Sequence, residues 1–419
     1  MTILLTVLIT VLVTVILLNL SSGEKKIQQR IEPLYSVAEP QFRRSMGSLL
    51  GPPLVDGNVV TPLRNGHQIF PAMLEAIRGA QQTITFETFI YWTGSIGREF
   101  AEALSERAKA GVKVHVLLDW VGSRRMNADL LELMENSGVE IRRYHPPRWY
   151  SISRLNNRTH RKLLVVDGTV GFTGGVGIAD QWLGDAEDKE HWRDSHFRLR
   201  GPAVLQMQAA FLDNWMKATG HVLHGAEYFP ESSVVGDVTA QMFRSDPGEG
   251  SESVRLMYLL SIASARESLR IAAAYFVPDD LSIATIVGAR KRGVMVQIIV
   301  PGPYIDTETT RKASRARWGK LLEAGVEIYE YQPTMYHCKV MIVDALWTTV
   351  GSTNFDNRSF RLNDEANLNV FDREFAASQI ADFEMDLQRS RRVTLEEWQR
   401  RPWREKLLEH AAALLRSQL

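Results

Sequence analysis

The sequence predicts an α/β protein made of two similar sheet-and-helix halves that follow an N-terminal transmembrane helix. Three observations predict it: an apolar run at residues 3–20, an alternation of strand-like and helical segments, and segments that occur twice in the same order. The chain has 419 residues, which leaves room for two or three domains. Its 45% of hydrophobic and 23% of charged residues are typical of a globular protein.

The N-terminal apolar run extends from Ile3 to Leu20. As a helix it rises about 27 Å, close to the thickness of the hydrocarbon core of a bilayer. The basic residues next to it all follow it and are Lys25, Lys26 and Arg30. This bias places the rest of the chain on the cytoplasmic face. A cleaved signal peptide is the alternative, since small residues occupy 21–23, but no basic residue precedes the run. We therefore expect an uncleaved anchor at 1–22 and a juxtamembrane linker at 23–50.

Strand-like runs alternate with helical patterns after the linker. The first half is expected to hold strands at 83–91 and 112–118, and helices at 98–109 and 128–136. This alternation predicts an α/β architecture with a largely buried sheet.

Three segments of the first half return in the second half in the same order. The pairs are 110–118 with 292–300, 137–141 with 324–328, and 160–167 with 337–344. A repeat of this size indicates that the chain is a duplication. The stretch 220–250 is rich in glycine, proline and serine and lacks a long periodic segment. We place the boundary near residue 230, with one half at 51–229 and the other at 230–419.

Charge and cysteine content exclude several classes of protein. Lys+Arg and Asp+Glu both count 49, so the formal charge is zero, which disfavours binding to nucleic acid through overall charge. The single cysteine, Cys338, excludes an intrachain disulfide and a zinc site of four thiolates.

Both halves carry the pattern His-x-Lys-x-x-x-x-Asp. Its members are His160, Lys162 and Asp167 in the first half, and His337, Lys339 and Asp344 in the second. Side chains at i and i+2 of a strand share one face, so each histidine points the same way as its lysine. One such pair alone is compatible with an ordinary surface strand. Two pairs at equivalent places in a repeat indicate a functional site.

These paired motifs resemble the phospholipase D superfamily, and the resemblance covers nearly all of the chain after the apolar run. Segments 351–363, 275–279 and 191–194 look specifically like the bacterial cardiolipin synthases. The resemblance implies a duplicated phospholipase D-like fold in which the two halves share one active site. It also implies a location in the bacterial inner (cell) membrane.

The resemblance further implies that one histidine attacks a phosphodiester while the other protonates the leaving group. It assigns His160 as the nucleophile and His337 as the acid and base, although the near-symmetric residues do not distinguish these roles by themselves. Neutral imidazole is a good nucleophile near pH 7. Because a phosphodiester is an anion, its oxygens must be neutralised first. The groups expected to hold them are Lys162, Lys339, Ser352 and Asn354.

Carboxylates are expected to orient the imidazoles. Glu365 fits the supporting acid of the family, and Asp194 is its expected counterpart in the first half. Asp167 and Asp344 complete the motifs, and for them a structural role and a chemical role stay open. The loop 174–177 ends in glycine where relatives usually carry an asparagine, so phosphate contacts there are limited to backbone N–H groups.

The activity implied is that of a phosphatidyltransferase that joins two phosphatidylglycerol molecules into cardiolipin and releases glycerol through a phosphohistidine. Rivals that stay open are a hydrolase that uses water, another transferase such as a phosphatidylserine synthase, a nuclease, and an inactive lipid-binding scaffold. The expected partners are anionic phospholipids and the membrane, with no nucleic acid. No cofactor or metal is expected, and the oligomeric state is left open.

Other patterns receive weaker interpretations. Glycines at 171–177 lack the third glycine of a dinucleotide-binding loop. Basic, acid-free runs at 141–166 and 311–320 are either solvated faces or, as we expect, the mouth of the pocket, where they would attract anionic head groups. Apolar residues at helical spacing in 407–415 predict a C-terminal helix that packs on the second half rather than on the bilayer.

Overall fold

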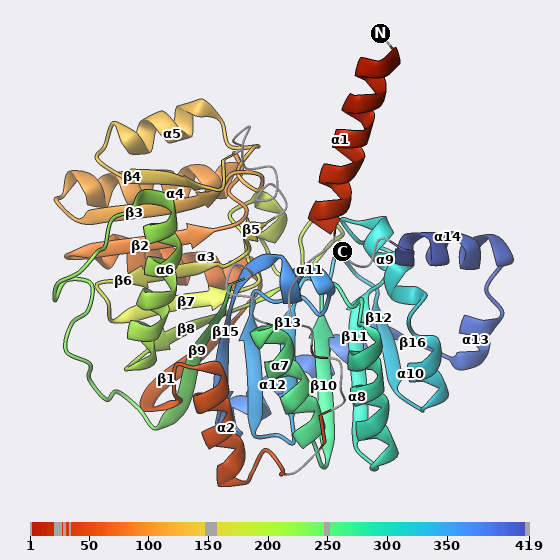
Figure 1. Cartoon of the computed structure of the whole chain (residues 1–419). Helices are drawn as coiled ribbons and strands as arrows, with labels where there is room; N and C mark the ends of the chain where they lie inside the picture. Colours follow the sequence, from red (N-terminus) through yellow and green to blue (C-terminus); the bar gives the residue numbers. More distant parts are fainter. Residues whose placement is uncertain are drawn as a thin grey trace.

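One mixed sheet of sixteen strands runs through both halves of the molecule (Figure 1). The computed structural model describes residues 2–20, 27, 31–32, 35–146, 157–246 and 252–414. The order of neighbouring strands is β16-β12-β11-β10-β13-β14-β15-β9-β1-β8-β7-β6-β2-β3-β4, and the short strand β5 pairs with β15. The centre of this order is β9-β1, and the strands on either side of it follow the same plan.

The first half contributes three parallel strands followed by an antiparallel meander. Its strands are β1 (Val55–Arg64), β2 (Thr83–Thr88), β3 (Lys113–Asp119), β4 (Glu140–Tyr144), β5 (Arg158–Thr159), β6 (Leu163–Val166), β7 (Val170–Gly174) and β8 (Ser195–Arg200). β2, β3 and β4 are parallel, whereas β6 runs antiparallel to β2 and continues through β7 to β8.

The second half repeats this arrangement. Its strands are β9 (Val238–Ser245), β10 (Ser268–Ala273), β11 (Met295–Pro301), β12 (Glu327–Tyr331), β13 (Lys339–Val343), β14 (Trp347–Gly351), β15 (Asn363–Phe371) and β16 (Ser390–Val393). β10, β11 and β12 are parallel, and β13, β14 and β15 form the meander. The predicted duplication into two similar α/β halves is therefore confirmed.

Helices cover both faces of the sheet. In the first half they are α3 (Asn65–Gly79), α4 (Ser95–Lys109), α5 (Ala128–Glu135), the 3-10 turn η2 (Asp180–Trp182) and α6 (Ala203–Thr219). In the second half they are α7 (Ser253–Ser264), α8 (Asp280–Lys291), α9 (Glu308–Arg315), α10 (Gly319–Glu323), α11 (Asn357–Arg361), α12 (Arg373–Gln388), α13 (Leu395–Gln399) and α14 (Trp403–Leu414).

The strands next to the motifs are apolar on both faces, as strands between two helical layers must be. Leu164 and Val166 of β6 face a core under α3 and α4, whereas Leu163 and Val165 face a second core under α6. That second core also contains Phe375 of α12, so the two halves share it. A shared core fixes the halves against each other and gives the motif strands a rigid setting.

The expected elements of the first half are present, with one difference. The strand expected at 83–91 ends at Thr88. Beyond it the Thr88 hydroxyl donates to the Ile90 carbonyl oxygen (3.0 Å), and Tyr91 forms an isolated bridge with Ile178. The chain therefore turns out of the sheet at Phe89, whose ring lies 5.3 Å from the ring of His160.

Helix α2 (Pro40–Leu50) lies within the range expected to be a linker. Its apolar side packs on the core of the second half, where Phe42 meets Trp347 edge to face with ring centroids 5.0 Å apart. Met46 and Leu50, at i+4 and i+8 from Phe42, are also buried. Residues 40–50 are therefore attached to the folded body.

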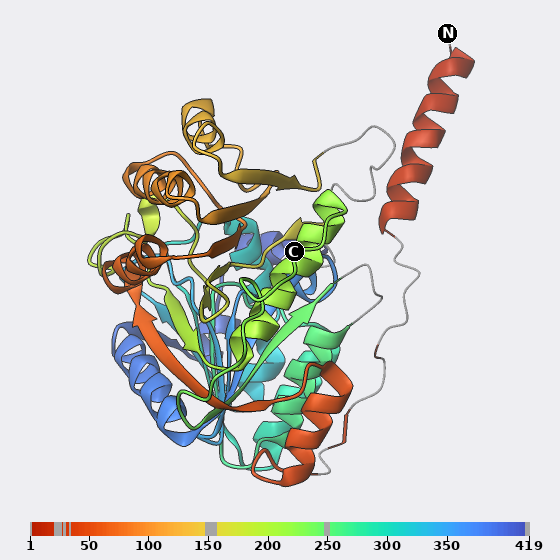
Figure 2. The ribbon, with the colours of Figure 1, turned by 90° about the vertical axis from the view of Figure 1, so that its left-hand side faces the viewer.

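Helix α1 (Thr2–Leu20) projects away from the body (Figure 1, Figure 2). Its described side chains between Leu5 and Val13 are exposed and almost all apolar. Within the described ranges, none of the helices combines the length and the apolarity that a membrane span requires. The basic residues on which the predicted orientation depends, and the alternative cleavage site at 21–23, lie outside the described residues.

Candidate active site

The two motif histidines lie at the starts of equivalent strands, and each is hydrogen-bonded to the opposite half. His160 precedes β6, and its backbone N–H donates to the Asp364 carbonyl oxygen (2.9 Å). His337 precedes β13, and its backbone N–H donates to the Arg193 carbonyl oxygen (2.8 Å). Strand β5 also pairs with the start of β15. The site is therefore built across the junction between the two halves.

Each imidazole is held by a carboxylate from the other half. His160 Nδ1 lies 3.0 Å from both carboxylate oxygens of Glu365. His337 Nδ1 lies 2.7 Å from Asp194 Oδ2. Because an ionised carboxylate only accepts hydrogen bonds, Nδ1 carries the proton in both rings, which leaves the Nε2 lone pairs for chemistry. The structure thus brings together His160, His337 and both predicted supporting acids.

The two carboxylates are held in turn by their own hydrogen-bond donors. Asp194 accepts from Trp182 Nε1 (2.9 Å) and from the Ser195 backbone N–H (2.8 Å). Glu365 accepts from the Ser352 hydroxyl (2.5 Å) and from Asn363 Nδ2 (3.4 Å). Ser352, expected to hold phosphate, therefore uses its hydroxyl to orient Glu365.

Close packing explains why the loop 174–177 of the first half is rich in glycine. Gly175 follows the last residue of β7 as Ser352 follows the last residue of β14. A Cβ atom at Gly175 would lie 2.2 Å from Asp194 Oδ1, so Asp194 occupies the space of a side chain there. Gly177 is the equivalent of Asn354 in the repeat, and a Cβ atom added at Gly177 would lie 2.8 Å from Ile90 Cβ. The missing asparagine is thus a consequence of tighter packing in the first half.

Both motif lysines are buried beside their histidines. Lys162 Nζ donates to the His160 carbonyl oxygen (2.7 Å), and Lys339 Nζ donates to the His337 carbonyl oxygen (2.6 Å). Lys339 Nζ also lies 3.1 Å from Nδ1 and 3.2 Å from Nε2 of His337. Among the described residues, neither ammonium forms an ion pair, so both charges are available to an anion.

Burial shifts the pKa values of the site toward neutral imidazole. It lowers the pKa of His160 to about 4, although Glu365 acts in the opposite direction. It also lowers the pKa of His337, and the charge of Lys339 lowers it further. Burial also lowers the pKa of Lys162 to about 7 and lowers the pKa of Lys339. A bound anion would offset this desolvation for all four groups.

The two carboxylates stay ionised in this buried setting. Burial alone would raise the pKa of Asp194, but His337, Lys339 and the bond from Ser195 hold it below its usual value. Burial likewise opposes ionisation of Glu365, and its histidine and lysine neighbours hold its pKa below the usual value. Both acids therefore carry the negative charge that an imidazolium needs during proton transfer.

Aromatic rings line the site, and two of them, Phe89 and Trp182, lie outside the motifs and the segments on which the family resemblance rests. Phe89 faces His160, while Trp182 and Trp192 lie with ring centroids 5.3 Å and 5.5 Å from that of His337. Tyr275 lies 6.5 Å from His337, and its hydroxyl donates to Asp306 Oδ2 (2.5 Å). Trp192 stands two residues before Asp194, and that closeness was the available sequence signal.

The structure does not bring Asp167 and Asp344 to the histidines. Each follows its strand at the end remote from the histidine and has a φ angle of 51°. The Asp167 carboxylate accepts three backbone N–H bonds at 2.8–2.9 Å, from residues 81–83. Asp344 does the same with residues 266–268. The contacts favour the structural role that the sequence had left open.

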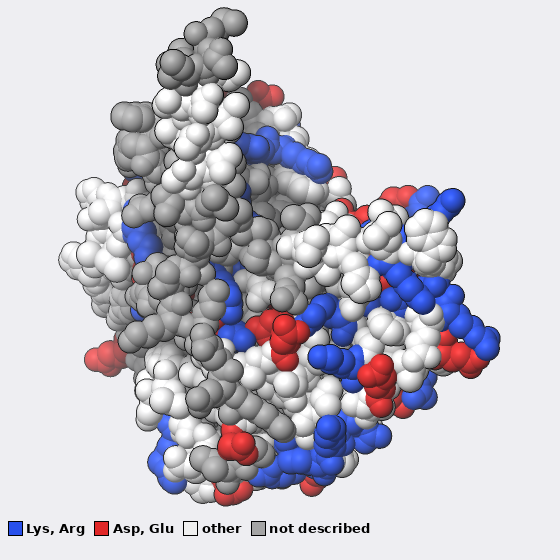
Figure 3. All heavy atoms as spheres, turned by 45° about the vertical axis from the view of Figure 1, so that its right-hand side comes forward, with Lys and Arg blue, Asp and Glu red and all other residues white. Residues whose placement is uncertain are grey.

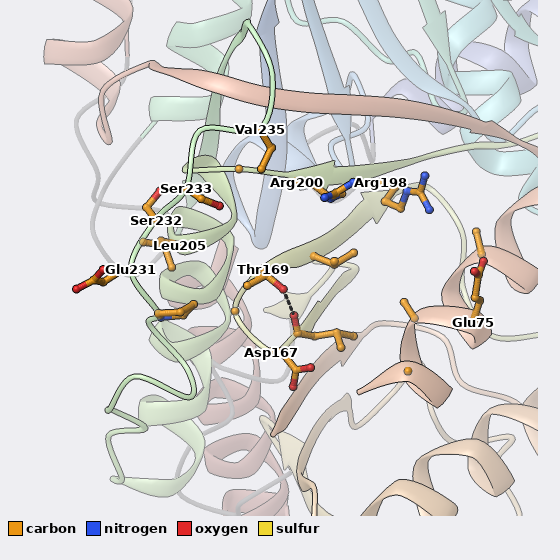
Figure 4. Close-up of a pocket in the computed structure, with 18 residues that line it drawn as sticks. Glu75, Asp167, Thr169, Arg198, Arg200, Leu205, Glu231, Ser232, Ser233 and Val235 are labelled. Carbon is orange, nitrogen blue, oxygen red and sulfur yellow. Dashed lines mark hydrogen bonds between the residues drawn. The ribbon is translucent and has the colours of Figure 1, made fainter. Parts of the chain in front are cut away.

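Figure 4 shows a pocket at that remote end of the first half, away from the histidines. Its volume is about 430 Å³, and Asp167, Arg198, Arg200 and Ser232 are among the residues that line it. The Asp167 carboxylate points away from Arg198 and Arg200 in this view (Figure 4). This pocket is therefore separate from the candidate active site.

Asn354 is buried in the loop after β14. Its backbone N–H donates to the Ser359 hydroxyl (3.2 Å), and its side-chain Oδ1 has no hydrogen-bond partner among the described residues. A buried amide oxygen without a partner is costly, and a donor such as the hydroxyl group of a bound alcohol would satisfy it. Residues 147–156 of the basic run expected at the pocket mouth, which include Arg148 and Arg154, lie outside the described residues.

Comparisons with known proteins agree with this geometry. A model of the phospholipase D-like domain of cardiolipin synthase matches residues 73–192 and 258–387, one region in each half. Cardiolipin synthase 2 of Bacillus anthracis is 35% identical over 356 residues, which cover 84% of this chain and 69% of that protein. The cardiolipin synthase of Halalkalibacterium halodurans is 34% identical over 356 residues, or 84% of this chain and 71% of that protein.

A solved structure has the same fold. The phosphatidylserine synthase of Haemophilus influenzae Rd KW20 superimposes with a TM-score of 0.70 at 15% sequence identity, over 91% of this chain and 100% of that one. The extent of the sequence matches and the paired histidine site together lead to one conclusion: the chain belongs to the cardiolipin synthase family of phospholipase D-like phosphatidyltransferases.

Proposed function

We propose that the chain makes cardiolipin by moving the phosphatidyl group of one phosphatidylglycerol to a hydroxyl of a second, with release of glycerol. One observation carries this proposal beyond family membership: each histidine is paired with a carboxylate from the opposite half, at 3.0 Å and 2.7 Å. Two oriented imidazoles on one phosphodiester are what a two-step transfer requires.

In the first step His160 Nε2 attacks the phosphorus of the donor lipid. A P–N bond forms and the P–O bond to glycerol breaks, while His337 gives its Nε2 proton to the departing glycerol oxygen. Lys162 and Lys339 neutralise the non-bridging oxygens, and their lack of carboxylate partners in the described part of the site supports that role. Approach of the anion raises the pKa of His337 and so supplies the acid.

In the second step His337 removes the proton of the acceptor hydroxyl. The resulting oxygen attacks the phosphohistidine, a P–O bond forms, and the P–N bond to His160 breaks. Asp194 stabilises the imidazolium that forms on His337, and Glu365 keeps the His160 ring in place. Imidazole and ammonium groups supply both the proton transfer and the charge neutralisation, so this chemistry requires no metal or cofactor.

Attachment to the membrane is part of the proposal. Helix α1 offers exposed apolar side chains along its described length, and it stands apart from the body (Figure 2). We infer that α1 is a single-pass anchor of the bacterial cell membrane, with the catalytic body on the cytoplasmic side. Protease added to intact spheroplasts should leave the body uncut and should cut it after lysis. Cleavage of the body in intact spheroplasts would contradict this orientation.

Product analysis with defined lipids tests the reaction. Vesicles of phosphatidylglycerol alone should yield cardiolipin and glycerol, identified by mass spectrometry, with phosphatidic acid as a minor product. Phosphatidic acid as the main product would establish the hydrolase instead. A strict requirement for a cytidine-nucleotide-activated lipid, with serine as acceptor, would establish a phosphatidylserine synthase-like transferase.

A further inference from the structure

Helix α14 presents its large apolar side chains to solvent and buries one charged side chain, Glu409, against the protein. Glu409 is 2% exposed and pairs with Arg315 Nε (3.1 Å) and with Arg401 Nη2 (2.8 Å). Of its described residues, only Ala412 is buried beside Glu409. The side chains that point outward include Trp403 and Leu407, exposed by 70% and 61%. This pattern is the reverse of a helix that is stabilised by packing on a soluble core.

The exposed apolar residues form a continuous stripe. Residues 403, 407, 411 and 414 are Trp, Leu, Ala and Leu, at the i, i+4, i+8 and i+11 positions of one helix face. Leu408 widens the stripe on one side and is 54% exposed, and Leu414 at its end is 83% exposed. Monomeric soluble proteins rarely display contiguous large apolar side chains in this way, so the stripe indicates a partner.

Helix α14 packs on α9, and α9 begins near the active site. Arg315, which holds Glu409, is the last residue of α9, and α9 begins at Glu308. Two residues before α9, Asp306 accepts a hydrogen bond from Tyr275, whose ring faces His337. Helix α9 therefore contacts α14 at its C-terminal end and leads, at its N-terminal end, to the residues beside His337. In Figure 1, α14 lies at the level of the lower end of α1.

The charges around the stripe fit an anionic lipid surface. The guanidinium of Arg404 lies 5.6 Å from the ring centroid of Trp403. The side chain of Arg400 is 79% exposed and pairs with Glu396 (2.7 Å), and Lys406 stands next to Leu407. In the right-hand part of Figure 3, white side chains have blue ones and some red ones around them. Tryptophan with neighbouring arginine and lysine is the composition of segments that lie at the interface of a membrane.

We propose that the outer face of α14 lies on the bilayer interface and holds the mouth of the active site against the lipid surface. This inference rests on the proposed function, because it takes the substrate to be a lipid within that bilayer. The stripe would enter the boundary between head groups and acyl chains, and the flanking cations would remain among the head groups. A lipid partner explains why α14 exposes its large apolar side chains and why it lies beside α9.

Depth measurements on the full chain test the contact without requiring turnover. We would replace Leu407 by cysteine, label it with an environment-sensitive fluorophore, and reconstitute the protein in phosphatidylglycerol vesicles. The one native cysteine, Cys338, is buried and stays unlabelled. Leu49→Cys is the matched control, because Leu49 is also 61% exposed and lies on α2, at the opposite end of the molecule (Figure 1, Figure 2).

The label at 407 should be quenched about twofold or more by brominated lipid and protected from aqueous iodide, and the label at 49 should show the reverse. Iodide quenching at 407 equal to that at 49 would overturn the proposal. Energy transfer between copies labelled at 407 that survives dilution in lipid would overturn it too, because a second copy of the chain would then cover this face.

Activity provides a second readout. Leu407→Glu should lower the rate on phosphatidylglycerol vesicles by about fivefold or more and leave the rate on a short-chain, monomeric phosphatidylglycerol unchanged. Leu49→Glu should leave both rates unchanged. An equal loss on both substrates would mean that Leu407 acts through the fold and would contradict the membrane contact. If wild-type protein made no cardiolipin at all, the proposed function would fail while the depth measurement stayed interpretable.

Discussion

His337 Nδ1 lies 2.7 Å from Asp194 Oδ2, and the two residues belong to different halves of the chain. In the other pair, the first half supplies the histidine, His160, and the second half supplies the carboxylate, Glu365. Neither half contains a complete pair of histidine and carboxylate. Chemistry therefore requires the two halves to be docked, which the shared core between α6 and α12 and the continuous sheet accomplish.

Removing the charge of Asp194 should disable His337. Asp194→Asn keeps the size of the side chain but gives His337 a neutral partner. The imidazolium of His337 is then no longer stabilised by a negative charge, and the Nδ1–H tautomer is no longer fixed. We expect kcat to fall by about 10²–10⁴. The control is Asp129→Asn at an exposed position in the first turn of α5, which should retain the wild-type rate. A kcat for Asp194→Asn within about threefold of wild type would show that the pair is not used.

The buried lysines predict a decline in activity at high pH. The pKa of Lys162 in the free enzyme is lowered by burial to about 7, so the ammonium that neutralises the phosphate loses its proton as the pH rises through that value. On a short-chain, monomeric lipid, kcat/KM should therefore fall above pH of about 7. An arginine at position 162 keeps its charge throughout this pH range. Lys162→Arg should therefore move the decline in kcat/KM to higher pH, even if the variant is slower than wild type. An identical decline in both proteins would exclude Lys162 as its cause.

Asp167 and Asp344 should affect stability rather than chemistry. Each carboxylate accepts three backbone N–H bonds at the end of its strand remote from the histidine. Asp344→Asn should therefore reduce the free energy of unfolding by about 1–3 kcal/mol, measured by denaturant titration. Its kcat per folded molecule should remain near wild type. A large loss of kcat at unchanged stability would instead assign Asp344 to the catalytic machinery.

Gly175 should tolerate no side chain. A Cβ atom added there would fall 2.2 Å from Asp194 Oδ1, so Gly175→Ala must displace the carboxylate that holds His337. We expect a loss of kcat of about 100-fold. Gly79→Ala is the matched control, because a Cβ atom there would meet nothing within 4 Å. Full activity of Gly175→Ala would show that Asp194 can move without consequence.

The motif residues could be found from the sequence because their signal is local and occurs twice. His160 with Lys162, and His337 with Lys339, stand two residues apart before apolar strands, and strand geometry places each pair on one face. The alternation of strands and helices predicted the two α/β halves in the same way. Glu365 and Asp194 were found through the family resemblance of the segments around them.

The cross-pairing could not be read from the sequence. It depends on which strands become neighbours across the junction, such as β5 with β15, and no local pattern records that choice. The same holds for α2, where Phe42 packs on Trp347 about three hundred residues further along the chain. The roles of Ser352 and Gly175 also depend on where Glu365 and Asp194 place their carboxylates, which only the folded chain determines.

Trapping the covalent adduct tests the central claim, that His160 carries the phosphatidyl group, most directly. Wild-type protein and the His337→Ala and His160→Ala variants would be quenched during turnover of phosphatidylglycerol and digested at neutral or alkaline pH, where a phosphohistidine survives. Peptide mass spectrometry should find an acid-labile phosphatidyl adduct on His160 in the wild type and in His337→Ala, and none in His160→Ala. An adduct on His337 that persists in His160→Ala would contradict this assignment and reverse the two roles.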